Sequence, residues 1–283
     1  MRVETIELKK YFKALGENDK NPTLDMYVPS NLSKLYPDRR APAVIICPGG
    51  AYIDLAERES EVVALFFISM GFSAFVLNYS TSPHRYPSQL EELMAAVAYV
   101  RRNAENMRID ADKVFVCGFS AGGHLAGSVG ILGNKHMLLR KLDVTRAESR
   151  PNGMILCYPV TDNDIYSERI NCFDYLMGKD SSHEERCSAS LSRNVSVDTP
   201  PAFIWHTLTD ATVPVKSSIV FAEALEKNNI PFELHIFAGG PHGLSLCNHQ
   251  TSSENTPQYY NKAVAEWKTL LMNWLKYEFD INI

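Results

Sequence analysis

The sequence predicts an α/β protein whose central sheet is mostly parallel, has about eight strands and is flanked by helices. Short β-rich runs alternate along the chain with longer segments of helical periodicity. The middle runs VIIC, VFVC and MILC are apolar at every position, which is typical of strands buried on both faces. Because 45% of the 283 residues are hydrophobic, the chain can bury a sizeable core, and we expect a single domain over residues 1–283.

The predicted strands begin with two that have no helix between them, which indicates antiparallel members at the start of the sheet. From Val44 onward, strands and helices alternate, as in a parallel sheet that is covered by helices. The eight expected strands are 3–8, 24–28, 44–47, 73–78, 114–117, 154–158, 202–207 and 233–237. The expected helices are 59–70, 88–106, 122–132, 217–228 and a long one from about 256 to 277.

Composition and charge exclude several functional classes. A net charge of −5, with acidic and basic residues mixed along the chain, gives no sign of a basic surface for nucleic acid. The longest apolar stretches fall far short of the roughly 18 residues of a membrane span, and the charged N-terminal segment lacks the apolar centre of a signal peptide. The six cysteines form no CxxC pair, so we expect free thiols and a cytoplasmic protein.

The segment GFSAGGHLA, residues 118–126, contains a GxSxG pattern centred on Ser120. It follows the apolar run VFVC and opens a helical segment, the strand–turn–helix setting of a nucleophile elbow. Gly118 and Gly122 flank the serine because such a tight turn needs small residues. The helix N-terminus favours a developing negative charge near the hydroxyl. Ser120 is therefore the predicted nucleophile, and a plain glycine-softened turn is the alternative.

A serine hydroxyl needs a base to take its proton, and His242 is the preferred candidate among eight histidines. It lies in the loop AGGPHGLSL shortly after the predicted strand ELHIF, where an imidazole can reach over the sheet edge. His124 lies inside the helix that follows the serine, so we expect it to pack or to form a supporting hydrogen bond. His206 and His235 lie inside strands, and His206 is expected to be a satisfied core histidine.

Asp210 is the predicted acid that orients the imidazole of His242. It comes just after the strand expected at 202–207, in the segment WHTLTDATVPV. Asp162 and Asp164 also follow a strand end and remain rivals. A loop aspartate that caps the next helix is the other interpretation of Asp210, although the predicted helix starts too far along the chain for a simple N-cap.

The loop CPGGAY, after the third predicted strand, is expected to supply donors for an oxyanion. Pro48 has no N–H, so the candidate donors in this loop are the backbone N–H groups of Gly50 and Ala51. The N–H of Ala121, directly after the nucleophile, is the remaining candidate. Tyr52 follows the loop and is expected to line the substrate pocket, with packing beneath the pocket as the alternative.

With these residues placed, the chain resembles the α/β-hydrolase superfamily. Within it, the chain is similar to the branch of acetyl-xylan-esterase-like and hormone-sensitive-lipase-like carbohydrate esterases. The segments LDMYVP, PGGAY, GFSAGGHLA, LCYPV, PPAFIWHTLTDATVPV and HIFAGGPHGLSL occur in the family order, from about residue 24 to the last helix. The resemblance implies an α/β-hydrolase fold, on which the chain order Ser120, Asp210, His242 is the expected one.

Two departures from the family pattern matter. Family members commonly carry HGGG or PGGGY in the oxyanion loop, whereas Ala51 replaces the third glycine here. Alanine keeps its N–H, so the oxyanion hole can survive if the local φ is negative. Lipase-like relatives also carry a tyrosine–arginine pair where this chain has Asn78, Tyr79 and Ser80, which favours the carbohydrate-esterase side of the branch.

The polar segment at about 161–197 is expected to be a small cap-like insertion, since caps of the α/β-hydrolase fold occur at this point of the chain. It lacks the long apolar face that docks on lipid, which suits a small or sugar-linked acyl group and fits an ordinary surface lobe equally well. The leading hypothesis is a serine esterase that removes short acyl groups, acetyl above all, from small-molecule esters that include those of carbohydrates.

Two other interpretations stay open. The same triad could cleave amides, as in arylformamidases or prolyl-oligopeptidase-like enzymes, although the chain has no room for a propeller domain. A non-catalytic hydrolase scaffold is the remote alternative, since such proteins have usually lost a member of the triad. The sequence contains no HExxH or comparable metal-ligand cluster, so neither a metal nor a cofactor is expected, while a homo-oligomer is compatible with it.

Overall fold

The computed structural model describes residues 1–17, 21–30, 37–166 and 170–281. The strands within these ranges form one eight-stranded sheet. The strands are β1 (Arg2–Glu7), β2 (Thr23–Val28), β3 (Ala41–Cys47), β4 (Ser73–Asn78), β5 (Ile109–Phe119), β6 (Gly153–Cys157), β7 (Ala202–Thr207) and β8 (Phe232–Phe237). Their order across the sheet is β1-β2-β4-β3-β5-β6-β7-β8. β1 pairs antiparallel with β2, β2 pairs antiparallel with β4, and all the other neighbours pair in parallel. The predicted fold class and its antiparallel start are confirmed.

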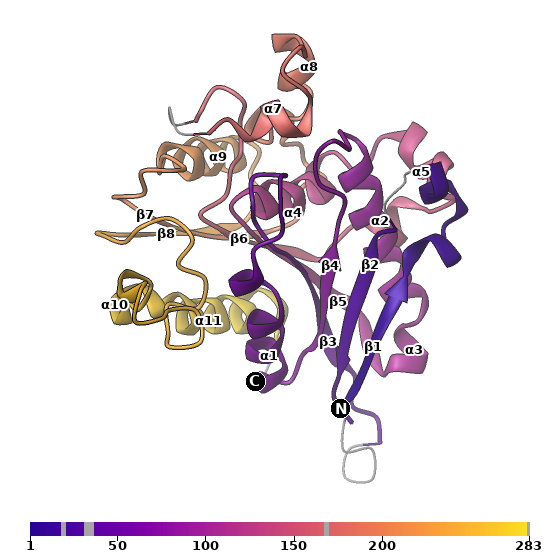
Figure 1. Ribbon diagram of the computed structural model, residues 1–283. Coiled ribbons are helices and arrows are strands. Elements are labelled where there is room, and N and C mark those ends of the chain that lie inside the picture. Colours follow the sequence, from indigo (N-terminus) through magenta and orange to yellow (C-terminus); the bar gives the residue numbers. More distant parts are fainter. Residues whose placement is uncertain (18–20, 31–36, 167–169, 282–283) are drawn as a thin grey trace.

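Helices cover both faces of the sheet, as Figure 1 shows. One face carries α1 (Glu61–Ser69), α10 (Lys262–Ala265) and α11 (Trp267–Phe279). The other face carries α2 (Ser88–Arg102), α3 (Ala104–Met107), α4 (Ala121–Ile131) and α9 (Lys216–Lys227). Two short helices, α5 (His136–Leu142) and α6 (Arg146–Ser149), pack against α2. At the top of Figure 1, α7 (Cys172–Leu176) and α8 (His183–Cys187) lie beyond α4 and α9.

The strands divide their side chains between two hydrophobic cores, because successive residues of a strand point to opposite faces. On β3, the side chains of Ala43, Ile45 and Cys47 belong to the core shared with α2 and α4. Val44 and Ile46 belong to the core shared with α1 and α11. Both faces of β3 are therefore buried, which explains why the segment VIIC is apolar at every position.

The long C-terminal helix expected from about 256 to 277 is interrupted in the structure. A single 3-10 turn at Pro257–Tyr259 comes first, and α10 begins only after Asn261, whose side chain accepts a hydrogen bond from the N–H of Val264. Proline cannot donate, and asparagine satisfies helix N–H groups best from a cap position, so these residues stop a continuous helix. The helix expected at 88–106 likewise ends at Arg102, and α3 follows as a separate turn. The helices α5 to α8 were not expected, because each is too short to show a helical period.

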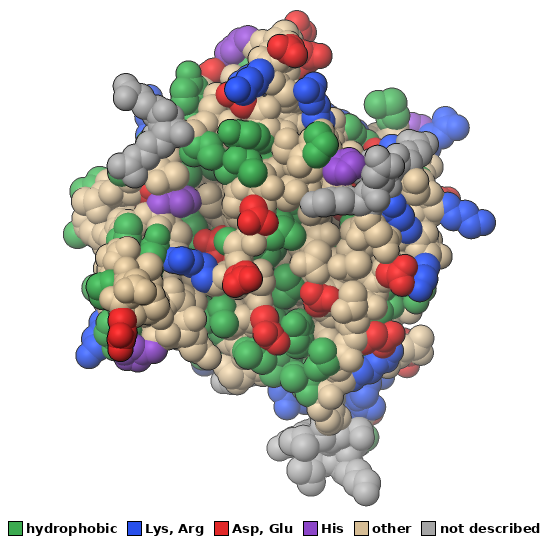
Figure 2. Space-filling model, viewed as in Figure 1, with side chains coloured by type: hydrophobic (Ala, Val, Ile, Leu, Met, Phe, Trp, Pro, Cys, Tyr) green, Lys and Arg blue, Asp and Glu red, His purple; other side chains and the backbone are tan. Residues whose placement is uncertain are grey.

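The expected cap-like insertion lies between β6 and β7 and contains α7 and α8; its residues 167–169 lie outside the described part of the chain. Side chains of both charges are interspersed over the face seen in Figure 2. Among the helices of the described residues, none has both the length and the apolar character needed to traverse a bilayer.

Candidate active site

Three side chains from the ends of three different strands meet in one hydrogen-bonded chain. Ser120 lies in the turn between β5 and α4, Asp210 follows β7, and His242 follows β8. The Nε2 atom of His242 lies 2.8 Å from Oγ of Ser120, and its Nδ1 atom lies 2.7 Å from Oδ2 of Asp210. The structure thus brings together the three residues that the sequence predicted for the triad, across as many as 122 positions of the chain.

The turn that carries Ser120 is strained and closely packed. Ser120 has φ 55° and ψ −119°, a conformation that side chains rarely adopt. A Cβ on Gly118 would lie 2.1 Å from the carbonyl oxygen of Gly122, and one on Gly122 would lie 2.1 Å from that of Cys47. The N–H of Ser120 donates to the carbonyl of Cys157 at 3.0 Å. Neighbouring backbone therefore holds the serine in its strained conformation.

Asp210 is a buried carboxylate with donors on both oxygens. Its Oδ1 accepts from the N–H groups of Thr212 at 2.8 Å and Val213 at 2.9 Å, while Oδ2 faces His242 and lies 3.3 Å from Nε2 of His206. Burial raises the pKa of Asp210, but hydrogen bonds from His206 and His242 outweigh it, and the pKa lies below its usual value. Asp210 is therefore ionised and can stabilise a positive charge on His242.

The rival acids are occupied elsewhere in the described structure. Asp162 accepts a hydrogen bond from the hydroxyl of Ser192, and Asp164 pairs with Arg193. Neither bonds to an imidazole of the triad. His206 lies inside β7, fully buried and with both ring nitrogens bonded, as expected of a satisfied core histidine.

Tyr52 lies beneath the site and does not line its cavity, which corrects the expectation that it contacts substrate. The side chain is 1% exposed, and its hydroxyl lies 2.7 Å from Nδ1 of His124. The other ring nitrogen of His124 lies 2.8 Å from the carbonyl oxygen of Ala189, in the insertion between β6 and β7. Burial lowers the pKa of His124 to about 4, so this histidine is neutral. It supports the site and has no contact with Ser120 through its ring.

The loop after β3 has a left-handed backbone. Gly50, Ala51 and Tyr52 have φ of 124°, 56° and 63°, and the N–H of Ile53 donates to the carbonyl of Gly50 at 2.9 Å. A Cβ on Gly50 would lie 2.0 Å from the carbonyl oxygen of Asp54. The condition of a negative φ at Ala51 is therefore not met, because the tight turn demands a left-handed residue at this position.

The candidate oxyanion donors nevertheless keep their N–H groups. Within the described parts of the chain, the N–H groups of Gly50 and Ala51 meet no acceptor. Ala121 is the first residue of α4, where an N–H has no acceptor within the helix. Gly50 and Ala51 line the same cavity as Ser120, so a negatively charged oxygen that develops there has donors close at hand.

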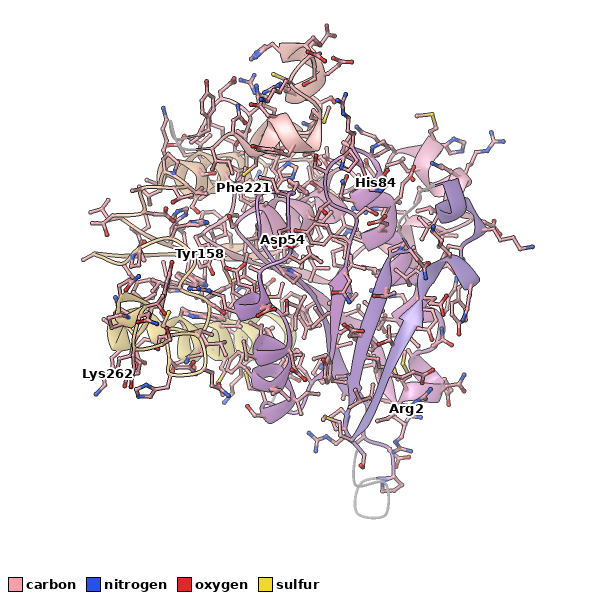
Figure 3. The ribbon with its side chains drawn as sticks, viewed as in Figure 1. Arg2, Asp54, His84, Tyr158, Phe221 and Lys262 are labelled. Atoms are coloured by element: carbon pink, nitrogen blue, oxygen red, sulfur yellow. The ribbon has the colours of Figure 1, made fainter. Side chains whose placement is uncertain are left out.

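Glu59 is a residue of the site that the sequence analysis missed. It is 3% exposed; its Oε2 accepts from the N–H of Gly49, and its Oε1 from the hydroxyl of Tyr158, both at 2.7 Å. Tyr158, at the end of β6 in Figure 3, accepts in turn from the N–H of Ser245, and its ring packs edge-on against His242 at 5.0 Å. Burial raises the pKa of Glu59, although hydrogen bonds from Tyr158 and Gly49 lower it in part. This carboxylate connects the oxyanion loop to the loop of the base.

The cavity at Ser120 and His242 has a volume of about 250 Å³. Part of its wall is apolar and comes from Ile170 and Cys172, in the insertion, and from Val213, in the loop of the acid. A second pocket shares these three residues and has a volume of only about 10 Å³, which is at the lower limit for a single water molecule. Among the described residues, the apolar side of the cavity therefore adjoins little further space.

One group of side chains among the described residues has metal-ligating chemistry. Ligand atoms of Asp164, His183 and Cys187 lie within 4.8 Å of one another, in and beside the insertion. Asp164 pairs with Arg193, and none of the three lines the cavity at Ser120. The group takes no part in the arrangement around the serine.

Comparison with known proteins assigns the family. The BD-FAE family model matches residues 24–225 of the chain, a range that contains Ser120, Asp210 and the oxyanion loop. The chain belongs to the BD-FAE family. His242 lies beyond the matched range, so its place in this BD-FAE protein rests on the hydrogen bonds given above.

The sequence relatives of this BD-FAE protein include enzymes of xylan breakdown by name. It is 34% identical over 231 residues to endo-1,4-beta-xylanase B of Butyrivibrio fibrisolvens, which covers 79% of this chain and 36% of that protein. It is 27% identical over 252 residues to the acetylxylan esterase of Xylanibacter ruminicola, with 87% and 48% covered. The chain spans half or less of the length of these two relatives.

Solved structures match the chain over nearly its whole length. The acetyl ester-xyloside bifunctional hydrolase of Caldicellulosiruptor lactoaceticus aligns with a TM-score of 0.83 and 33% identity, over 99% of this chain and 98% of that one. The carboxylesterase Cest-2923 of Lactobacillus plantarum WCFS1 aligns with a TM-score of 0.88 and 25% identity, over 100% of both. The α/β-hydrolase fold and the esterase branch predicted from the sequence are confirmed.

Proposed function

We propose that this BD-FAE protein is a serine-dependent carboxylic ester hydrolase. It removes short acyl groups, acetyl above all, from carbohydrates and other small alcohols. The hydrogen-bonded chain from Ser120 through His242 to Asp210, at the edge of a cavity with free N–H groups, carries the proposal. The names of its relatives, which include an acetylxylan esterase and a carboxylesterase, support it.

The geometry supports a two-step acyl transfer. Oγ of Ser120 attacks the acyl carbon while Nε2 of His242 takes the hydroxyl proton. The carbonyl oxygen becomes an oxyanion, which the N–H groups of Gly50 or Ala51 and Ala121 stabilise. His242 then returns its proton to the leaving alcohol oxygen as the ester bond breaks. A water molecule repeats the sequence on the acyl-enzyme, which releases the carboxylic acid and restores the serine.

The apolar part of the cavity argues for a short acyl group. A methyl group can pack against Ile170, Cys172 and Val213, and the adjoining pocket that shares these residues has a volume of only about 10 Å³, too small for a long chain. An acetyl ester is therefore a better substrate than an octanoyl ester with the same leaving group.

The test is hydrolysis of p-nitrophenyl acetate and p-nitrophenyl octanoate by the wild-type protein and by Ser120→Ala. We expect the acetate to be cleaved faster, and the variant to lose activity by a factor of at least about 10³. A fluorophosphonate probe should label the wild-type protein on Ser120 and leave the variant unlabelled. Equal rates of ester hydrolysis for the wild-type protein and Ser120→Ala would contradict the proposal. Hydrolysis of an N-formyl aryl amine, measured in parallel, decides between ester and amide chemistry.

A further inference from the structure

Arg58 lines the cavity at Ser120, and its guanidinium group has no acceptor among the described residues. Its central carbon lies 4.0 Å from the centroid of the Tyr259 ring, and both side chains line the cavity. Nη1 of Arg58 is buried and has no hydrogen-bond partner. Across the part of the chain that the structure describes, no hydrogen bond or ion pair involves this guanidinium. The guanidinium therefore stacks on Tyr259 with a buried donor that no described residue satisfies.

A buried N–H of a cation without an acceptor is unfavourable, and native proteins rarely retain one without a reason. Stacking on Tyr259 stabilises the charge through the ring face but leaves the N–H groups of Nη1 unsatisfied. The planar guanidinium presents its donors in a rigid fork that suits oxygen acceptors. Since Arg58 borders the cavity in which the substrate reacts, an oxygen of the substrate is the natural partner for it.

Arg58 also borders a second hollow, which has a volume of about 580 Å³. It therefore lies between the catalytic cavity and this outer space. Nearly all the other side chains around the hollow are polar and carry hydroxyl, amide or carboxylate groups. They are Glu57, Ser60, Glu61, Gln250, Thr251, Ser252, Ser253 and Thr256.

The charges of the two spaces select the kind of ligand. Glu57 and Glu61 at the outer hollow repel an anion and accept hydrogen bonds from hydroxyl groups. Arg58 and Gln250 donate, so they need a ligand that also has acceptor oxygens. A neutral polyhydroxylated group meets both requirements, whereas a carboxylate or an alkyl chain meets at most one.

We propose that Arg58 and the outer hollow form a subsite for the sugar of a carbohydrate ester. The sugar is the leaving group of the reaction, and Arg58 donates a hydrogen bond to one of its oxygens while the acyl group occupies the apolar side of the cavity. The inference rests on the proposed esterase function and adds a specificity-determining residue to it. Arg58 positions the alcohol part of the substrate and takes no part in proton transfer.

The test compares acetylated xylo-oligosaccharides with p-nitrophenyl acetate, whose leaving group has no hydroxyls. Arg58→Met keeps an unbranched apolar stem over Tyr259 and removes the donors, whereas Arg58→Lys keeps the charge without the fork. We expect Arg58→Met to lower kcat/KM for the sugar acetates about 10- to 100-fold, which is the worth of one charge-assisted hydrogen bond. For p-nitrophenyl acetate the loss of kcat/KM should stay below about threefold. On the sugar acetates, kcat/KM of Arg58→Lys should lie between those of the wild type and Arg58→Met.

A matched control is Arg2→Met, at an exposed arginine of β1 that pairs with Glu4. This variant should leave kcat/KM unchanged for both substrates. Binding without turnover is the second readout: in Ser120→Ala protein, calorimetry should detect the acetylated xylo-oligosaccharide more weakly once Arg58→Met is added. A heat-unfolding transition recorded for the double variant verifies that it is folded.

The outcomes separate the subsite from the esterase proposal. Equal losses of kcat/KM on both substrates, or no loss on the sugar acetates, would overturn the subsite. So would a wild-type protein that cleaves p-nitrophenyl acetate and none of the sugar acetates, although the esterase proposal would stand. Wild-type rates in Ser120→Ala would instead overturn the esterase proposal itself.

Discussion

Two turns at the ends of neighbouring strands build the site, and they are held in different ways. The turn after β5 places Ser120 at φ 55°, and the turn after β3 places Ala51 at φ 56°. Backbone atoms crowd the first turn, since a Cβ on Gly122 would lie 2.1 Å from the carbonyl oxygen of Cys47. The second turn is held by a side chain, because Glu59 accepts the N–H of Gly49 just before it. Close packing determines the nucleophile turn, and a buried carboxylate orients the oxyanion turn.

The two turns are also connected to each other. Gly122 packs against the carbonyls of Cys47 and Pro48, at the start of the oxyanion loop. The hydroxyl of Tyr52, in the oxyanion loop, bonds to His124, in the helix behind the nucleophile. A change in one turn should therefore alter the geometry of the other.

Gly122→Ala should break the packing of the nucleophile turn. The added Cβ would meet backbone oxygens of Cys47 and Pro48 at 2.1 Å and 2.4 Å, and backbone cannot yield cheaply. We expect the free energy of unfolding to fall by about 3 kcal/mol or more, with loss of ester hydrolysis. Urea unfolding measures the free energy of unfolding. Gly239→Ala is the matched control, because its Cβ would be 3.8 Å from the nearest atom; equal stability of the two variants would refute the argument.

His124→Gln should remove a pH dependence of stability. Burial lowers the pKa of His124 from 6.5 to about 4, so between these values the unfolded chain binds a proton that the folded protein does not. Stability then falls as the pH falls, and the wild-type protein should lose about 2 kcal/mol more than the variant from pH 7 to pH 5. Urea unfolding at both pH values tests this. The exposed His136 provides the control, since His136→Gln should behave like the wild type.

Glu59→Gln should reduce catalysis by loosening the oxyanion turn. Each carboxylate oxygen of Glu59 accepts from a different donor, and in a glutamine an NH2 group replaces one of these oxygens, so either the N–H of Gly49 or the hydroxyl of Tyr158 loses its acceptor. We expect kcat for p-nitrophenyl acetate to fall about tenfold with little change in KM, because the effect falls on the transition state. Glu223→Gln, at an exposed position of α9, should leave both constants unchanged. An unaltered kcat in Glu59→Gln would show that the carboxylate does not position the loop.

Since burial raises the pKa of Glu59, its ionised form is disfavoured in the folded protein. The wild-type protein should therefore lose stability as the pH rises through this pKa, whereas Glu59→Gln should not. Urea unfolding of the two proteins over a series of pH values distinguishes this effect from a simple packing defect, which would be the same at every pH.

Ala51→Gly should have the smallest effect and the opposite sign. Relief of a left-handed alanine gains about 1–2 kcal/mol, and the greater freedom of glycine in the unfolded chain costs about 0.4–1 kcal/mol. The net expectation is a gain of about 0.5 kcal/mol in the free energy of unfolding. Ala51→Val should be destabilising in the same urea experiment, since a branched side chain resists positive φ. A loss of stability in the glycine variant would mean that the turn is not strained.

Much of this arrangement could be read from the chain because it depends on local patterns. Apolar runs that need cover on both faces predict the parallel strands, and the glycines around Ser120 record a turn with no room for side chains. The loops after the strands of Asp210 and His242 have to converge at one edge of a parallel sheet. These features are dictated by neighbours in sequence and by the geometry of the sheet.

Other features were decided only when distant segments packed together. The positive φ of Ala51 follows from a turn that closes against Asp54, and Tyr52 points inward because His124 offers it a buried partner. Glu59 looks like any acidic residue before a helix until the fold buries it between Gly49 and Tyr158. Local sequence patterns were enough to predict the fold class and the three residues that meet at Ser120. The tertiary structure decided which polar groups lie buried and paired around them, because burial and hydrogen bonding depend on contacts that no local pattern contains.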